Sequence, residues 1–353
     1  MRRAKAMLVC MCLAVPWGAP LAATLCVSPA GTQTQPYDNW DNAFSNIQAA
    51  VGFAGAGDVV WITNGIYQVT NQISVSNAIS LVSAAGAAST VVQRASGSQR
   101  VFYLDHTLAV LDGLTITNGY AAGANGGGVY IKNGSVRNCT IMLNSCPSGG
   151  TTGGGVYMEA GGMASNCVIA KNWGYSGGGG VSGGTVLNCV IAANSCQDGY
   201  GAGVRSPRLL RDCRITGNVG VGYNSNGGGV YGGVVVDSTI ADNQVKGAGG
   251  GVYGGTLTNC IVYHNTAYVP NTMNYTGAPA FAFSCVTPAA AGTGNTAADP
   301  HFADRAAGDY RLVAGSPCIG TGTNGSWTTS ATDLDGKDRV WPGGGIVDMG
   351  AYE

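Results

Sequence analysis

A seven-residue pattern, [ND]-[CS]-x-[IV]-x-x-N, recurs six times along the middle of the chain. Its copies begin at Asn138, Asn166, Asn188, Asp212, Asp237 and Asn259. A glycine-rich start precedes each copy: GGGVY at Gly126, Gly153, Gly227 and Gly249, GGGVS at Gly178, and GAGVR at Gly201. Successive copies are 22 to 28 residues apart, and internal repetition at this period is typical of a solenoid.

The apolar residues within each copy indicate strands. They alternate over short runs, as in Val129–Ile131 and Cys139–Ile141, which is the period of a β-strand rather than of a helix. The leucine and asparagine spacing of leucine-rich repeats is absent. The sequence therefore predicts an all-β, right-handed parallel β-helix with two or three short strands in each coil.

Stacking of coils about 4.8 Å apart places equivalent residues in columns. We expect Val, Ile and Cys to point inward and the glycines to form corners where a Cβ would clash with the next coil. The last position of the pattern is always asparagine: Asn144, Asn172, Asn194, Asn218, Asn243 and Asn265. Asparagine tolerates left-handed backbone and its amide can bond along a column, so this position predicts a turn with an amide ladder.

Two families share these motifs. The GGGVY starts and the seven-residue pattern resemble the polymorphic outer-membrane protein repeats, although Ile or Val stands here where that family has Phe. The flanking segments DNWDNAFSNIQAAVGFAGAGDVVWITNGIY and TDLDGKDRVWPGGGIVDMGAYE resemble the choice-of-anchor Q family. That resemblance implies a secreted or surface β-helix of the pectate-lyase type with largely uncharacterised activity. Members often continue into an anchoring tail, whereas this sequence stops at Glu353.

The first residues indicate export. A basic start, MRRAK, precedes the apolar run AMLVCMCLAVPW and the small residues GAPLAA, which predicts a signal peptide over residues 1–23. No later run approaches the roughly 18 apolar residues of a membrane span, so we expect no transmembrane segment after cleavage. Net charge is −1 and no basic run occurs, which argues against nucleic-acid binding. We expect a secreted or cell-surface protein.

We predict three further parts after the signal peptide. Residues 24–57 form an N-terminal cap with a short helix, because Phe44, Ile47, Val51 and Ala54 recur at helical spacing. Residues 58–298 form the β-helix. Residues 299–353, where the repeat dissolves and Pro, Gly and Asp become frequent, form an irregular C-terminal cap.

Ten of the 12 cysteines follow the predicted signal peptide. Five of these share one inward column: Cys139, Cys167, Cys189, Cys213 and Cys260. In-register side chains suit disulfide geometry poorly, so we interpret the column as small buried thiols. Cys146 and Cys196 lie two coils apart and are not expected to pair. Cys26, Cys285 and Cys318 are placed to join the caps to the body, with partners unassigned.

An acid pair is the first candidate site. Asp212 and Asp237 occupy the first pattern position in consecutive copies, which places them about 5 Å apart with Arg214 nearby. Three interpretations stay open: a polar column neutralised by Arg214, a cation site, or the paired carboxylates of a retaining glycosidase.

Aromatic residues are the second candidate. They stand near the same edge of nearly every coil, as Tyr130, Tyr157, Trp173, Tyr175, Tyr200, Tyr223, Tyr231 and Tyr253. Flat rings stack on sugar faces, so this pattern is compatible with a polysaccharide surface. The alternative, which stays open, is that the rings merely cover glycine-rich backbone.

The segment DLDGKD, with Asp333, Asp335 and Asp338, faintly resembles a calcium loop but lacks its full spacing. A cap turn is the alternative, and we otherwise expect no cofactor. We predict a binding or adhesive surface for polysaccharide. A polysaccharide lyase or glycoside hydrolase on the same fold, and a structural envelope component, are the competing hypotheses.

Overall fold

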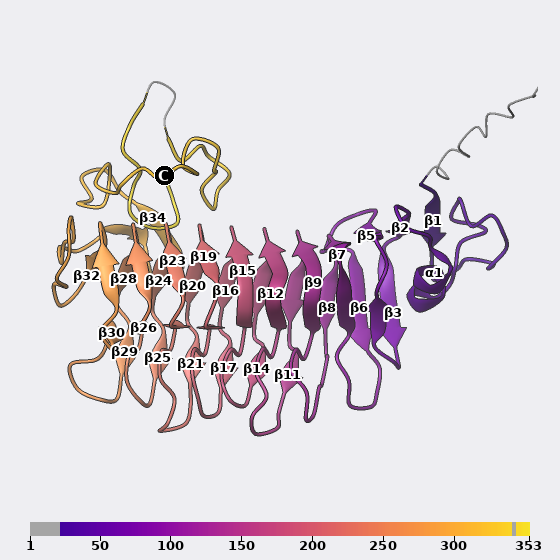
Figure 1. Cartoon of the computed structure of the whole chain (residues 1–353), viewed down its shortest axis with the longest axis horizontal. Helices are drawn as coiled ribbons and strands as arrows, with labels where there is room; N and C mark the ends of the chain where they lie inside the picture. The colour runs from indigo at the N-terminus through magenta and orange to yellow at the C-terminus, as the bar shows by residue number, and fades with distance from the viewer. Residues whose placement is uncertain (1–21, 341–343) are drawn as a thin grey trace, which may run out of the picture.

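The computed structural model describes residues 22–340 and 344–353 and is a right-handed parallel β-helix, which confirms the predicted fold class (Figure 1). Its coils stack into three parallel sheets of 16, 10 and 6 strands. Residues 1–21, which hold nearly all of the predicted signal peptide, lie outside the described residues. In the part of the chain that the structure describes, no helix has the length and apolarity to cross a membrane.

The large sheet contains β1 (Thr24–Val27), β2 (Val59–Ile62), β4 (Ile73–Val75), β5 (Ser80–Ser83), β7 (Phe102–Asp112), β9 (Val129–Arg137), β12 (Val156–Ser165), β15 (Val181–Leu187), β18 (Val204–Arg205), β19 (Leu209–Arg211), β22 (Val230–Tyr231), β23 (Val234–Val236), β26 (Val252–Tyr253), β27 (Thr256–Thr258), β30 (Tyr275–Thr276) and β31 (Ala280–Ala282). The medium sheet contains β3 (Gly65–Val69), β6 (Thr90–Arg94), β8 (Thr115–Thr117), β10 (Thr140–Met142), β13 (Val168–Ala170), β16 (Val190–Ala192), β20 (Arg214–Thr216), β24 (Thr239–Ala241), β28 (Ile261–Tyr263) and β32 (Cys285–Val286). The small sheet contains β11 (Ser145–Cys146), β14 (Trp173–Gly174), β17 (Ser195–Cys196), β21 (Val219–Gly220), β25 (Gln244–Val245) and β29 (Thr266–Ala267). A helix, α1 (Ile47–Phe53), and an antiparallel pair, β33 (Phe302–Asp304) with β34 (Asp309–Leu312), lie outside these sheets.

The pairing register confirms that matching letters of successive copies lie above one another. In the large sheet the valine of each glycine-rich start pairs with its copy, as Val129 does with Val156 and Val156 with Val181. In the medium sheet Ile141 pairs with Ile169 in the same way. These inward residues are fully buried and form one continuous core along the solenoid.

The glycine-rich starts are the corners that lead into the large sheet. Gly227 has a left-handed backbone with φ 69°, which L side chains rarely adopt. A Cβ on Gly228 would lie 2.4 Å from the carbonyl oxygen of Gly250, and one on Gly229 would lie 2.7 Å from that of Gly251. The coils therefore approach so closely at this corner that no side chain fits between them.

The asparagine column forms the predicted amide ladder, but not in a left-handed turn. Asn194 donates both its backbone N–H and its side-chain amide to Oδ1 of Asn218, at 2.9 and 3.0 Å, and this arrangement recurs along the column. The left-handed residue is the one before each asparagine, such as Ala193 at φ 53°. The buried amide is thus needed for hydrogen bonding, and its neighbour makes the turn. Asn274, outside the repeat, adds one further rung below Asn265.

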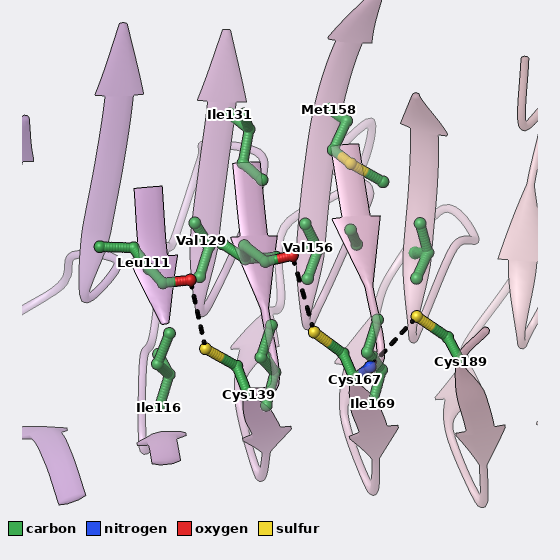
Figure 2. Close-up of a cluster of buried hydrophobic side chains, with 14 of the residues drawn as sticks. Leu111, Ile116, Val129, Ile131, Cys139, Val156, Met158, Cys167, Ile169 and Cys189 are labelled. Atoms are coloured by element: carbon green, nitrogen blue, oxygen red, sulfur yellow. Dashed lines mark hydrogen bonds between the residues drawn. The ribbon is translucent and has the colours of Figure 1, made fainter. Parts of the chain in front are cut away.

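The cysteine column lines the core (Figure 2). All the cysteines between residues 22 and 340 are buried and present as free thiols. The column members also serve the backbone: Sγ of Cys189 accepts the N–H of Cys167 at 3.4 Å and donates to the carbonyl of Leu187 at 3.1 Å. A thiol at this corner is therefore a small apolar side chain that also satisfies buried polar groups.

The N-terminal end is covered by α1, which is shorter than the apolar spacing predicts. The side chain of Asn46 accepts the N–H of Ala49 and caps the helix. Phe44, which we expected in the helix, lies before this cap. Its backbone forms a parallel bridge with Val27 in β1. The large sheet therefore begins inside the segment that we expected to form the cap.

The residues after β32 separate into two parts. Residues 287–298 close the last coil, where Thr296 bridges to Cys285 and Ala290 packs against the core. Residues 299–340 and 344–353, named here the C-terminal segment, lie along one flank of the later coils rather than over their end (Figure 1). This segment contacts the first pattern positions of four successive coils, from Asn188 to Asn259.

Candidate functional sites

Asp212 and Asp237 lie directly above one another, as the repeat predicts. Each opens its copy in a left-handed turn, with φ 55° and 45°, a conformation that suits Asn and Asp. Both are buried beneath the C-terminal segment, with 1% and 0% of their surface exposed. The pair is therefore close together but closed to a polymer in solution.

All four carboxylate oxygens of the pair accept a hydrogen bond. Arg339 donates to one oxygen of Asp212 at 2.9 Å and Arg211 donates to the other at 3.1 Å. For Asp237, Asn259 donates at 2.7 Å and the indole N–H of Trp327 at 3.0 Å. The arrangement is a satisfied ionic network in the interior, without a free oxygen for substrate or cation.

Arg339 is the central member of this network. Its side chain is fully buried, and it also donates to the carbonyl oxygens of Asp237 and Gly350 and to the carboxylate of Glu353. It stands 127 residues after Asp212, so the repeat alone gave no indication of this partner.

Arg214 does not neutralise the acids as the sequence suggested. It projects outward from β20, donates to the carbonyl of Gly308 at 2.9 Å and lies over the ring of Tyr310. Asp212 lies in the turn before that strand, so the two side chains leave the backbone in different directions. Arg214 instead holds the β33–β34 hairpin against the medium sheet.

Burial raises the pKa of three carboxyls, Asp212 beneath the C-terminal segment and Asp348 and Glu353 within it, against the opposing effect of Arg339. For Glu353 the pKa rises to about 7. A pKa raised on folding means that the folded state favours the protonated acid. The protonated Glu353 carboxyl therefore stabilises the folded state fully at pH values below the pKa of this carboxyl in the unfolded chain. This stabilisation is lost as pH rises through about 7.

We therefore expect the C-terminal segment to unfold at lower urea concentration at pH 7.5 than at pH 5. Glu353→Gln keeps a hydrogen-bond acceptor for Arg339 but cannot ionise, so it should flatten this dependence. Urea titrations at several pH values, followed by tryptophan fluorescence, measure both effects. Glu159→Gln, far from the segment, is the control and should leave the pH dependence unchanged.

The three aspartates of the DLDGKD segment do not converge. Asp333 is buried and accepts the backbone N–H groups of Asp335, Lys337 and Glu353, so it organises a turn. Asp335 pairs with Arg311 through both carboxylate oxygens. Asp338 lies on the exposed side of this turn. Within residues 22–340 and 344–353, no group of three or more His, Cys, Asp or Glu is arranged to hold a metal ion.

The predicted aromatic row divides into two groups. The first, named here the tyrosine face, consists of Tyr103, Tyr130, Tyr157, Tyr231 and Tyr253 on the large sheet, together with Tyr200, which precedes β18 and packs its ring against Tyr231. The second lies at the small sheet and its turns, where Trp173 contacts Tyr175 and Tyr223 contacts Tyr268. Coils carry aromatic residues at two edges, not one.

Tyr103 belongs to the tyrosine face although the sequence pattern missed it. It pairs in register with Tyr130, and their rings lie 5.3 Å apart. Its strand has the same alternation, VFYL against GVYI, but no glycine-rich start marks it. Arg100 lies over the ring of Tyr130 at 5.1 Å and is another contribution from this early coil.

The rings of the tyrosine face stack on one another in two runs. Tyr103, Tyr130 and Tyr157 form the first, and Tyr200, Tyr231 and Tyr253 form the second, with neighbouring centroids 4.4 to 5.3 Å apart. Neighbouring rings are inclined to each other by 20° to 39°, so a ring inside a run is partly covered on both sides by its neighbours.

The two runs are separated by Ser182 and Arg205, which occupy the tyrosine position in two consecutive coils. Their smaller or more flexible side chains leave a hollow of about 350 Å³. Tyr157, Thr152 and Asn125 also line it. This hollow combines an aromatic ring, several hydroxyl and amide groups, and one guanidinium group.

No family model matches the chain, and no curated protein does. Among solved structures, the pectate lyase Pel9A is 15% identical over 95% of this chain and 97% of its own, with a TM-score of 0.61. A pectin methylesterase from carrot is 15% identical over 75% of this chain and 89% of its own, with a TM-score of 0.46. The chain therefore has the pectate-lyase type of β-helix fold.

Proposed function

We propose that this protein binds polysaccharide along its tyrosine face, with the hollow at Tyr157, Ser182 and Arg205 as the central site. The observation that carries the proposal is the break between the two runs of stacked rings, where an aromatic side chain and a guanidinium group line one open hollow. Export to the cell surface or medium, as the first residues predict, is part of this proposal.

The dimensions of the solenoid suit an extended polymer. Successive coils repeat every 4.8 Å or so, which is close to the advance of one sugar unit in an extended chain. A glycan along the axis would therefore meet an equivalent side chain at each coil. Tyrosine hydroxyls and edges along the two runs supply repeated weak contacts, and the hollow supplies the specific one.

The charge of the hollow favours an acidic sugar. Arg205 lines it, and a planar guanidinium group binds a carboxylate through two hydrogen bonds. The carboxylates near the same face are already engaged, since Asp105 pairs with Lys132 and Glu159 accepts the hydroxyl of Tyr130. The solved pectate lyase acts on pectate by its name, so polygalacturonate is the first probe.

Catalysis is the competing proposal, because lyases and hydrolases use this fold, and a fold alone does not fix function. The acid pair that suggested it is buried and fully hydrogen-bonded. Binding without cleavage is therefore the function that the geometry supports best.

Retention of the protein on immobilised polygalacturonate and on a neutral glycan tests the proposal. We expect retention on the acidic polymer. Tyr157→Ala and Arg205→Ala should each weaken it roughly tenfold, a loss of about 1.4 kcal/mol. Tyr223→Ala, an exposed tyrosine of the other group, is the matched control and should leave retention unchanged.

The same samples are assayed for new reducing ends and for unsaturated sugars. Cleavage would contradict pure binding and support the lyase or hydrolase. The absence of both retention and cleavage across acidic and neutral glycans would favour a structural envelope component.

A further inference from the structure

Two buried cysteines lie in one cluster at the boundary between the β-helix and the C-terminal segment. Cys285 lies in β32, on the last coil, and Cys318 lies in the C-terminal segment. Both are fully buried in one cluster with Ile261 and Met349. The neighbouring Cys318 is also the largest cause that raises the pKa of the Cys285 thiol.

This pair differs from the cysteine column in how its members approach. Column thiols come from parallel, in-register positions and point the same way, which suits the dihedral angle of a disulfide poorly. Most also donate to the backbone of their own corner two residues earlier, as Cys189 does to Leu187, whereas the thiol of Cys285 donates to the carbonyl of Ala298, 13 residues later, at 3.1 Å. Cys285 and Cys318 come from two separate pieces of chain that pack into one buried cluster, so the parallel, in-register arrangement of the column does not constrain them.

The chain around each cysteine is held in place independently of the pair. The N–H of Cys285 donates to the carbonyl of Cys260 in the preceding coil, at 2.8 Å. The carbonyl of Cys318 accepts the N–H of Met349, at 2.9 Å. Ordered backbone on both sides keeps the two sulfur atoms together in the folded protein.

We propose that Cys285 and Cys318 form a disulfide that fastens the C-terminal segment to the β-helix. The oxidant is a disulfide-bearing compound or protein, RS–SR. One cysteine thiolate attacks a sulfur of RS–SR, which releases one RSH and leaves a mixed disulfide. The second thiolate then displaces the remaining RS group as RSH, so two electrons and both thiol protons pass to the oxidant.

Because the pair is buried, disulfide formation must precede the docking of the C-terminal segment or take place when this segment opens. An oxidant cannot reach a fully buried thiol, so the reaction takes place before the C-terminal segment docks or when it transiently opens. The folded, reduced protein should therefore oxidise slowly, whereas protein refolded in the presence of oxidant should acquire the bond readily. Once formed, the bond closes the loop that contains β33 and β34, which restricts the unfolded chain.

The experiment is to refold the full chain with a mixture of reduced and oxidised glutathione, block remaining thiols and digest without reduction. We expect a cross-linked pair of tryptic peptides, because Arg305 and Arg311 separate the two cysteines. Cys260 shares a tryptic peptide with Cys285, so Cys285→Ser is needed to identify the sulfur. Cys285→Ser and Cys318→Ser should each abolish the link and leave the partner cysteine open to alkylation.

Cys146→Ser is the matched control, since it replaces another buried thiol and should leave the cross-link intact. A second measurement does not depend on the variants: oxidised wild-type protein should release its C-terminal segment to protease at higher urea concentration than reduced protein. Free thiols at both positions after refolding, or a link to any other cysteine, would overturn the proposal. Glycan binding is tested on the other face and is independent of either outcome.

Discussion

Arg339→Met should lower the free energy of unfolding of the C-terminal segment and the coils beneath it by about 3–5 kcal/mol. Methionine approximates the apolar length of arginine, so the main change is the loss of charge and hydrogen-bond donors. Asp212 would then keep only Arg211, and the carbonyl oxygens of Asp237 and Gly350 would lose a donor. Removing one member of a buried ion pair costs this much because the remaining charge stays buried.

Arg311→Met is the control for this experiment. Arg311 also pairs with an acid of the C-terminal segment, Asp335, but half of its side chain is exposed. Exposed pairs contribute about 0–1 kcal/mol, so the control should change the urea midpoint little. Equal effects of the two substitutions would contradict the view that Arg339 is the central member of the network.

A second substitution separates charge from packing. Asp212→Asn in the Arg339→Met background removes the buried carboxylate that has lost Arg339, so it should recover part of the lost stability. Asp212→Asn alone should be destabilising, because it leaves Arg339 with a weaker partner. Failure of the double variant to recover stability would mean that the loss comes from packing.

The repeat predicted the fold well because every coil imposes the same local conditions. A valine, a glycine corner or a buried asparagine at one position must match its copies in the coils on either side. Alignment of the repeats alone was therefore enough to predict the inward columns that contain Val129, Ile141 and Cys139. We predicted the left-handed residue of each turn one position too late, at the asparagine instead of the residue before it. Asparagine suits both a left-handed turn and a buried amide ladder, and only the hydrogen bonds in the structure distinguish the two.

The candidate sites were harder to predict than the fold, because they depend on contacts that occur at one place only and are not repeated from coil to coil. Asp in place of Asn at two consecutive copies left three interpretations open, and the one with a neutralising arginine named Arg214. The arginine is Arg339, whose position depends on how an unrepeated segment packs against the flank of the coils. The tyrosine column was readable from the strand period, but ring stacking and the hollow at Arg205 depend on side-chain orientation, which spacing does not give.

Asn218→Ala should destabilise the middle of the β-helix by about 2–6 kcal/mol. The substitution removes the acceptor of the Asn194 backbone N–H and a donor to the carbonyl of Ile191, both of which are buried. Each buried polar group left without a partner costs about 1–3 kcal/mol. Asn224→Ala, at an exposed turn, removes an asparagine without disturbing the ladder and is the control.

The effect of Asn218→Ala should also be local along the axis. Each coil contacts only its neighbours, so a weakened interface lowers the stability of adjacent coils more than that of distant ones. Hydrogen exchange should therefore accelerate most in the coils that contain Asn194 and Asn243 and remain near its original rate around Ile116. Uniform acceleration over the whole solenoid would show that the coils unfold as one unit, which is incompatible with a ladder whose rungs act on their neighbours.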